Sequence, residues 1–145
     1  MKVDSTVVVQ TVRLDISTRC ENDVVDITEE VRNAVSSSSI NSGLVCVFVS
    51  GSTATITAIE FEAGLIKDFV TTLSRIAPAD ITYEHDKRWQ DGNGRSHVKA
   101  SLIGPDLVVP LSNGKLELGT WQRIVLVEFD IRPRRRSIVI QIVGE

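Results

Sequence analysis

The sequence has few cysteines and no long apolar segment. Two cysteines, Cys20 and Cys46, are too few for a disulfide framework, which favours reduced thiols. The longest apolar run, residues 44–49, has six residues, whereas a membrane-spanning helix requires ~20. The first residues lack the basic stretch and long apolar core of a secretory signal. We therefore expect a cytoplasmic protein that makes no use of a membrane.

An excess of positive charge is also absent. The formal net charge is −3, which argues against a general nucleic-acid binder. Residues 132–136 hold four arginines, but no aromatic residues are interleaved with them for base stacking. Nucleic acid is thus the least favoured partner, and the alternatives are a solvated turn or a clamp for phosphate or another subunit. Arg132, Arg134 and Arg136 are also the nearest candidate partners along the chain for the acidic Glu128 and Asp130.

Several well-known catalytic motifs are missing. The sequence contains no Gly-Lys-Ser/Thr ending of a P-loop, no His-Glu-x-x-His and no Cys-x-x-Cys. Nucleotide binding through a P-loop and the usual zinc motifs are therefore excluded. Both histidines lie within residues 83–101, so this segment is the first place to look for acid–base chemistry.

What the sequence does have is an abundance of β-branched residues. It holds 20 valines and 14 isoleucines against 10 leucines, and branching at Cβ suits a strand better than a helix. Hydrophobic patterning predicts helices over 26–37 and 64–77, and Asn113-Gly114 predicts a hairpin turn. The predicted strands are 7–14, 44–50, 55–60, 96–103, 107–111, 115–118, 121–130 and 137–143.

These elements predict a single β-rich α+β domain over residues 1–145. It should have about seven or eight strands and two helices, and the short connections between the last strands favour antiparallel pairing.

The predicted strand 96–103 generates the main functional hypothesis. Side chains alternate between the faces of a strand, so His97, Lys99 and Ser101 should share one face. A histidine near neutrality can act as an acid or base, and a lysine ammonium suits phosphate. The alternative is the ordinary polar face of any half-buried strand.

Neighbouring polar segments could complete such a site. Gly92-Asn93-Gly94 can bring backbone close to a ligand, and Ser52 and Thr53 could cradle an anion. Glu60 ends the following strand. For the segment at Ser52, a simple turn between two strands is the alternative.

Several segments together resemble the YjbQ-like family, also described as secondary thiamine-phosphate synthases. The resemblance covers nearly the whole chain, in order. The matching pieces include Ser52-Thr53-Ala54, Glu60, Tyr83-Glu84-His85-Asp86, Gly92-Asn93, residues 97–104, residues 114–122, Glu128-Phe129-Asp130 and Arg132-Pro133-Arg134.

The resemblance implies an antiparallel β-sandwich-like core, a trimeric assembly and a cleft at the subunit boundaries. It also implies an activity that joins a pyrimidine diphosphate to a thiazole phosphate. Many family members have histidine where this chain has Gly51 and Arg95. Arg95 suits an anionic ligand better than a divalent cation.

We therefore expect a transferase of the thiamine-phosphate synthase type. Its substrate would be a small phosphorylated molecule, with Mg²⁺ as the expected cofactor and no metal ligands assigned. The alternative is a non-catalytic trimeric binding protein for a phosphorylated small molecule. The candidate catalytic residues are His97, Glu60, Asp91 and His85. The candidate ligand-binding residues are Ser52, Thr53, Asn93, Arg95, Lys99, Ser101, Trp121, Gln122, Arg132 and Arg134.

Overall fold

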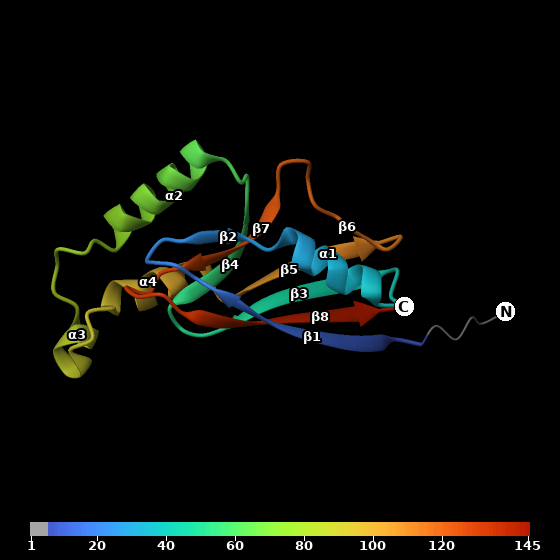
Figure 1. Cartoon of the computed structure of the whole chain (residues 1–145), viewed down its shortest axis with the longest axis horizontal. Coiled ribbons are helices and arrows are strands. Elements are labelled where there is room, and N and C mark those ends of the chain that lie inside the picture. The colour runs from blue at the N-terminus through green and yellow to red at the C-terminus, as the bar shows by residue number, and fades with distance from the viewer. Residues whose placement is uncertain (1–5) are drawn as a thin grey trace.

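The computed structural model describes residues 6–145, which form two antiparallel sheets and four helices (Figure 1). The strands are β1 (Val8–Ser17), β2 (Val24–Asp26), β3 (Gly43–Ser50), β4 (Ala54–Ile59), β5 (Asp106–Ser112), β6 (Lys115–Leu116), β7 (Arg123–Glu128) and β8 (Arg135–Gly144). The helices are α1 (Thr28–Ser37), α2 (Ala63–Ile76), α3 (Glu84–Trp89) and α4 (Gly94–Ile103). None of the helices among these described residues is long and apolar enough to cross a membrane.

The two sheets pack against each other around one main core. One sheet has the order β1-β8-β3-β5-β6 and the other β2-β7-β4, and every strand pair is antiparallel. Alternation along β8 buries Ile138, Ile140 and Ile142 completely between the sheets. Val31 and Val35 of α1 pack into the same core. The expected α+β class with antiparallel sheets is confirmed.

A second, smaller core lies on the other face of the three-stranded sheet. Val125, Val127 and Phe129, in and just after β7, are fully buried there. They are covered by Leu73 of α2 and Ala100 of α4. The strand β7 is therefore buried on both faces, and α4 is one of the layers that covers it.

The outer face of the five-stranded sheet carries exposed apolar side chains. The strand register aligns Val9, Val143, Leu44 and Pro110 in one row across β1, β8, β3 and β5. Leu44 is 52% exposed and Val108 of the next row is 49% exposed. Such an apolar face on a sheet is typical of an interaction surface.

The prediction of a strand over 96–103 is wrong, because these residues form most of helix α4. The alternation of polar and apolar residues does not match the burial, since Lys99 is buried and Val98 is exposed. The face of β7 that points away from the main core is apolar and has to be buried. Ala100 of helix α4 packs against this face. Neither β2 nor α3 is among the predicted elements. With α3 and α4 added to the two predicted helices, the described residues form four helices instead of two.

A buried ionic network links the two sheets at one end. Arg136 of β8 donates to both carboxylate oxygens of Glu128 in β7, and its Nη2 also donates to Thr53 Oγ1 at 2.6 Å. Glu128 is completely buried and also accepts from Thr18 Oγ1 at 2.9 Å. Arg134 pairs with Asp130 at 2.8 Å. Of the three arginines that sequence position suggests as partners, Arg134 and Arg136 thus pair with the acidic residues at this end of β7, whereas Arg132 is exposed.

We expect Arg136→Met to lower the free energy of unfolding by ~3–5 kcal/mol, because it leaves Glu128 buried without a cation. Urea denaturation at fixed protein concentration measures the change. Arg135→Met is the matched control, since Arg135 pairs with Asp15 in solvent and should lose less than ~1 kcal/mol. Equal losses in the two variants would contradict the prediction, and adding Glu128→Gln to Arg136→Met should restore part of the loss.

Candidate functional site

Two histidines and two aspartates come together where α3 meets α4. His85 Nδ1 lies 3.3 Å from Asp91 Oδ1 and 3.4 Å from Asp86 Oδ1. The imidazole rings of His85 and His97 have centroids 4.4 Å apart. We call His85, Asp86, Asp91 and His97 the histidine–aspartate cluster. The structure thus brings together three of the four predicted catalytic residues, and adds Asp86.

The turn between the two helices builds this cluster. Gly92 has a φ of +72°, a conformation that favours glycine. Gly94 packs so closely that a Cβ there would lie 2.6 Å from Tyr83 Cβ. Its N–H donates to Asp86 Oδ1 at 2.8 Å. With its amide nitrogen turned toward Asp91, Asn93 donates to Asp91 Oδ1 at 3.1 Å. Backbone and amide donors therefore hold both carboxylates.

The cluster has the donor set of a divalent-cation site. One ligand atom each from His85, Asp86 and Asp91 lies within 4.8 Å of the others, and all three residues are half-buried. In residues 6–145 this is the one group of three such side chains at that spacing. A mixed imidazole and carboxylate set suits Mn²⁺, Fe²⁺ or Zn²⁺, whereas Mg²⁺ prefers oxygen ligands alone.

His97 connects the cluster to a cavity of about 210 Å³. The lining residues come from the loop after β3, from the start of β4, from α4 and from the turn after α4: Gly51, Ser52, Ala54, His97, Ala100, Ser101 and Pro105. Ser101 Oγ donates to the His97 carbonyl oxygen at 2.8 Å. Three predicted site residues, His97, Ser52 and Ser101, therefore share one cavity.

The expected common face of His97, Lys99 and Ser101 is wrong for Lys99. Successive helical residues rotate by about 100°, so positions i and i+4 share a face and position i+2 does not. Lys99 is 2% exposed and its Nζ lies 6.0 Å from the Phe129 ring. It therefore points toward the second core, away from the cavity that His97 and Ser101 line.

Glu60 and Trp121 lie in a different cavity from His97. This cavity measures about 340 Å³ and shares no lining residue with the 210 Å³ cavity. Its lining is Asp26, Glu60, Phe61, Glu62, Thr120, Trp121 and Arg123. Trp121 is 72% exposed, and the Gln122 side chain accepts a hydrogen bond from the Gly119 N–H at 2.7 Å. Within one chain these predicted residues do not meet the histidine–aspartate cluster.

Two of the four predicted cationic ligands, Arg95 and Arg134, already have carboxylate partners. Arg95 pairs with Glu21 at 2.8 Å, and this hydrogen bond raises the pKa of Arg95. Arg134 pairs with Asp130, and Thr53 Oγ1 donates to the same carboxylate at 3.1 Å. Arg132 is exposed.

Asp86 is the residue of the histidine–aspartate cluster that is not among the predicted site residues, although it follows His85 directly.

A family model described as "UPF0047 protein YjbQ-like" matches residues 12–145. The chain belongs to the YjbQ-like UPF0047 family. The resemblance noted from the sequence motifs is thereby confirmed.

Relatives of this family match along most of their length. A UPF0047 protein of Archaeoglobus fulgidus is 38% identical over 128 residues, which cover 88% of this chain and 97% of the relative. The UPF0047 protein YjbQ of Escherichia coli O157:H7 is 31% identical and covers 82% of this chain and 87% of the relative. A YbjQ-like protein of unknown function from Sulfolobus solfataricus P2 is 36% identical, with a TM-score of 0.91 over 97% of this chain and all of that one. The UPF0047 fold is thus shared at the level of the whole chain.

Burial gives Lys99 an unusual electrostatic state. Burial lowers the pKa of the Lys99 ammonium from its ordinary value of 10.5, and the charge of Glu21 offsets only part of the effect. In the pH window between the lowered pKa and 10.5, the unfolded chain holds more protons than the folded chain. The free energy of unfolding therefore rises with pH through this window, and below it the charged side chain destabilises the fold.

We expect Lys99→Met to raise the free energy of unfolding at pH 7 by about 1 kcal/mol, because methionine fills the space beside Phe129 without a buried charge. The alkaline rise in stability should also disappear. Urea denaturation between pH 7 and 10.5 measures both effects. Lys67→Met, at an exposed position of α2, is the control and should change little. A loss of stability in Lys99→Met would overturn this account.

Proposed function

We propose that this protein catalyses a metal-dependent transfer reaction on a small phosphorylated molecule at the histidine–aspartate cluster. The observation that carries the proposal is the three-residue donor set of His85, Asp86 and Asp91, which His97 joins to a cavity. A cluster of imidazole and carboxylate side chains beside a cavity is a common arrangement in active sites. The specific reaction we assign is the one that the family resemblance implies, the synthesis of thiamine phosphate.

This reaction forms one bond and breaks one bond. The thiazole nitrogen attacks the methylene carbon of the pyrimidine diphosphate, and the carbon–oxygen bond to the diphosphate breaks. The diphosphate leaves with the electron pair, so its developing charge needs stabilisation. His97 would stabilise this charge by donating a hydrogen bond to the leaving diphosphate. The Ser52 and Ser101 hydroxyls line the same cavity.

A divalent cation would supply further positive charge. His85, Asp86 and Asp91 would hold it, and it would neutralise the diphosphate oxygens. Mg²⁺ is the cation expected from the diphosphate chemistry, while the His85 nitrogen favours Mn²⁺. Ile131 Cδ1 lies 3.7 Å from where a Cβ at Gly92 would be, so the chain segment that continues into the exposed Arg132 passes close to the turn that holds Asp91.

We further propose that the protein is a trimer whose subunits cover the outer face of the five-stranded sheet. The row through Leu44 is apolar on all four strands and Val108 adds an exposed apolar side chain in the next row, which suits the core of an interface. The family resemblance implies a cleft at a subunit boundary that holds both Glu60 and His97, and within one chain these two residues line separate cavities.

The second candidate function is non-catalytic binding of a phosphorylated small molecule. The position of Lys99 favours it, because the buried ammonium leaves the cavity with fewer cations than diphosphate departure would use. For either function we propose the cytoplasm as the compartment, since Cys20 and Cys46 are both free thiols.

The activity test supplies both substrates with Mg²⁺ or Mn²⁺ and measures thiamine phosphate by its fluorescent oxidation product. We expect metal-dependent product formation that falls at least about a hundredfold in His97→Ala and in Asp91→Asn. Asp68→Asn, at an exposed position of α2, is the matched control and should keep the parent rate. Product no higher than in His97→Ala would refute catalysis, and saturable binding of the substrates without turnover would favour the second candidate.

The assembly test replaces Leu44 by lysine at the centre of the apolar row. We expect the parent protein to have the mass of three 15.9 kDa chains by light scattering, and Leu44→Lys to have the mass of one. The lysine charge, buried in the interface, would destabilise the assembly by more than the remaining contacts stabilise it. Ile76→Lys, at an exposed apolar position of α2, should leave the mass unchanged. A parent protein with the mass of one chain would contradict the proposal.

A further inference from the structure

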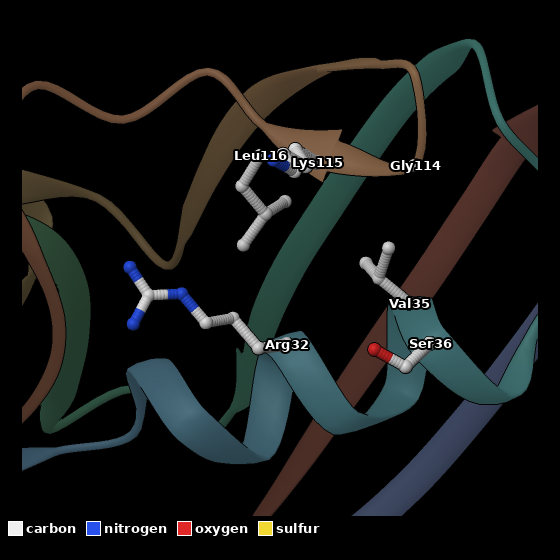
Figure 2. Close-up of a pocket in the computed structure, with 6 residues that line it drawn as sticks. All are labelled: Arg32, Val35, Ser36, Gly114, Lys115 and Leu116. Carbon is white, nitrogen blue, oxygen red and sulfur yellow. The ribbon is translucent and has the colours of Figure 1, made fainter.

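A separate cavity lies at the opposite end of the molecule from α3 and α4. Figure 1 shows α1 and the β5–β6 hairpin at this end, and Figure 2 shows the cavity between them. It measures about 340 Å³, near the lower end for small-molecule sites. The lining residues are Arg32, Val35, Ser36, Gly114, Lys115 and Leu116. The cavity shares none of them with the cavities described above.

Both walls of this cavity are held in place by the fold. Val31 and Val35 anchor α1 in the main core, which fixes Arg32 and Ser36 one turn apart at the rim. The opposite wall is the tight turn of the hairpin, where Gly114 has a φ of +73°. The Gly114 N–H donates to the Asn41 carbonyl oxygen at 2.9 Å. The cavity is therefore formed before any ligand arrives.

Two cations, Arg32 and Lys115, line the cavity. Arg32 Nη1 lies 2.6 Å from Glu29 Oε1 in a pair that is exposed to solvent. Arg123 Nη2 lies 3.5 Å from the same oxygen, but Arg123 has Asp26 as its closer partner at 2.8 Å. In the part of the chain from residue 6 onward, Lys115 has no ion-pair partner. An anionic group would therefore be attracted between Arg32 and Lys115.

The rest of the lining restricts the kind of anion. Figure 2 shows the Leu116 side chain directed toward α1, between Arg32 and Val35. Leu116 and Val35 give the ligand's body apolar contacts. The α1 residues extend to its last turn, where the negative end of the helix dipole disfavours an anion, and a doubly charged group more than a singly charged one. The planar guanidinium of Arg32 is complementary to a carboxylate.

We propose that this cavity binds a small organic carboxylate with an apolar body. Arg32 and Lys115 would hold the carboxylate, Ser36 would donate a hydrogen bond, and Val35 and Leu116 would contact the apolar part. The site is independent of the histidine–aspartate cluster, so neither proposal requires the other.

The test is an amide NMR titration of the full chain with benzoate, its uncharged analogue benzamide and phenyl phosphate. We expect benzoate to shift the amide signals of Ser36, Gly114 and Leu116 saturably. Benzamide should bind at least about fivefold more weakly, since it lacks the charge. Phenyl phosphate should also bind more weakly than benzoate, because it carries the second negative charge.

Surface variants separate this site from general ionic attraction. We expect Arg32→Gln and Lys115→Gln each to weaken benzoate binding by about five- to tenfold. Lys67→Gln removes the same charge from α2, away from the cavity, and should leave the affinity within about twofold. The proposal fails if benzoate shifts no signal at the cavity, if benzamide binds equally well, or if the three variants behave alike. Phenyl phosphate binding more tightly than benzoate would overturn the assignment to a carboxylate.

Discussion

The burial of β7 on both faces is the constraint on which the rest of the structure depends. Ile124 and Leu126 pack between the two sheets, while Val125 and Val127 face the opposite way into the second core. A strand that is apolar on both faces requires a layer on each side. The five-stranded sheet supplies one layer, and α2 and α4 supply the other. The position of α4, and with it that of His97, follows from this requirement.

The charged groups at the end of β7 are governed by the same burial. Glu128 and Asp130 are buried, and buried carboxylates require partners inside the fold. Arg136 and Arg134 fill this role, so arginines that suggest nucleic-acid or phosphate binding when read along the chain are largely engaged in structure. The groups left for chemistry are the half-buried histidines and aspartates of the turn between α3 and α4.

The candidate site was only partly predictable from local sequence. His85, Asp91, Asn93 and His97 lie within a short stretch, and the glycines between them indicate a tight turn, so their proximity could be expected. The burial of Lys99 could not be predicted, because polar and apolar side chains alternate along residues 96–103 whether these form a strand or a helix. Only the packing of α4 on β7 decides that Lys99 is inside. Glu60 was grouped with His97 through the family resemblance, yet the two line separate cavities in one chain.

The sequence by itself determined the β-rich class, the hairpin at Asn113-Gly114, the helices α1 and α2 and the family, because these depend on residue types and spacings over short distances. The tertiary structure alone decided that the segment containing His97 is a helix, that Lys99 is buried, and that Arg32 meets the hairpin at Lys115. Each of these depends on contacts between segments far apart in the chain. Which element buries which is decided by the whole fold, so it cannot be inferred from local sequence patterns alone.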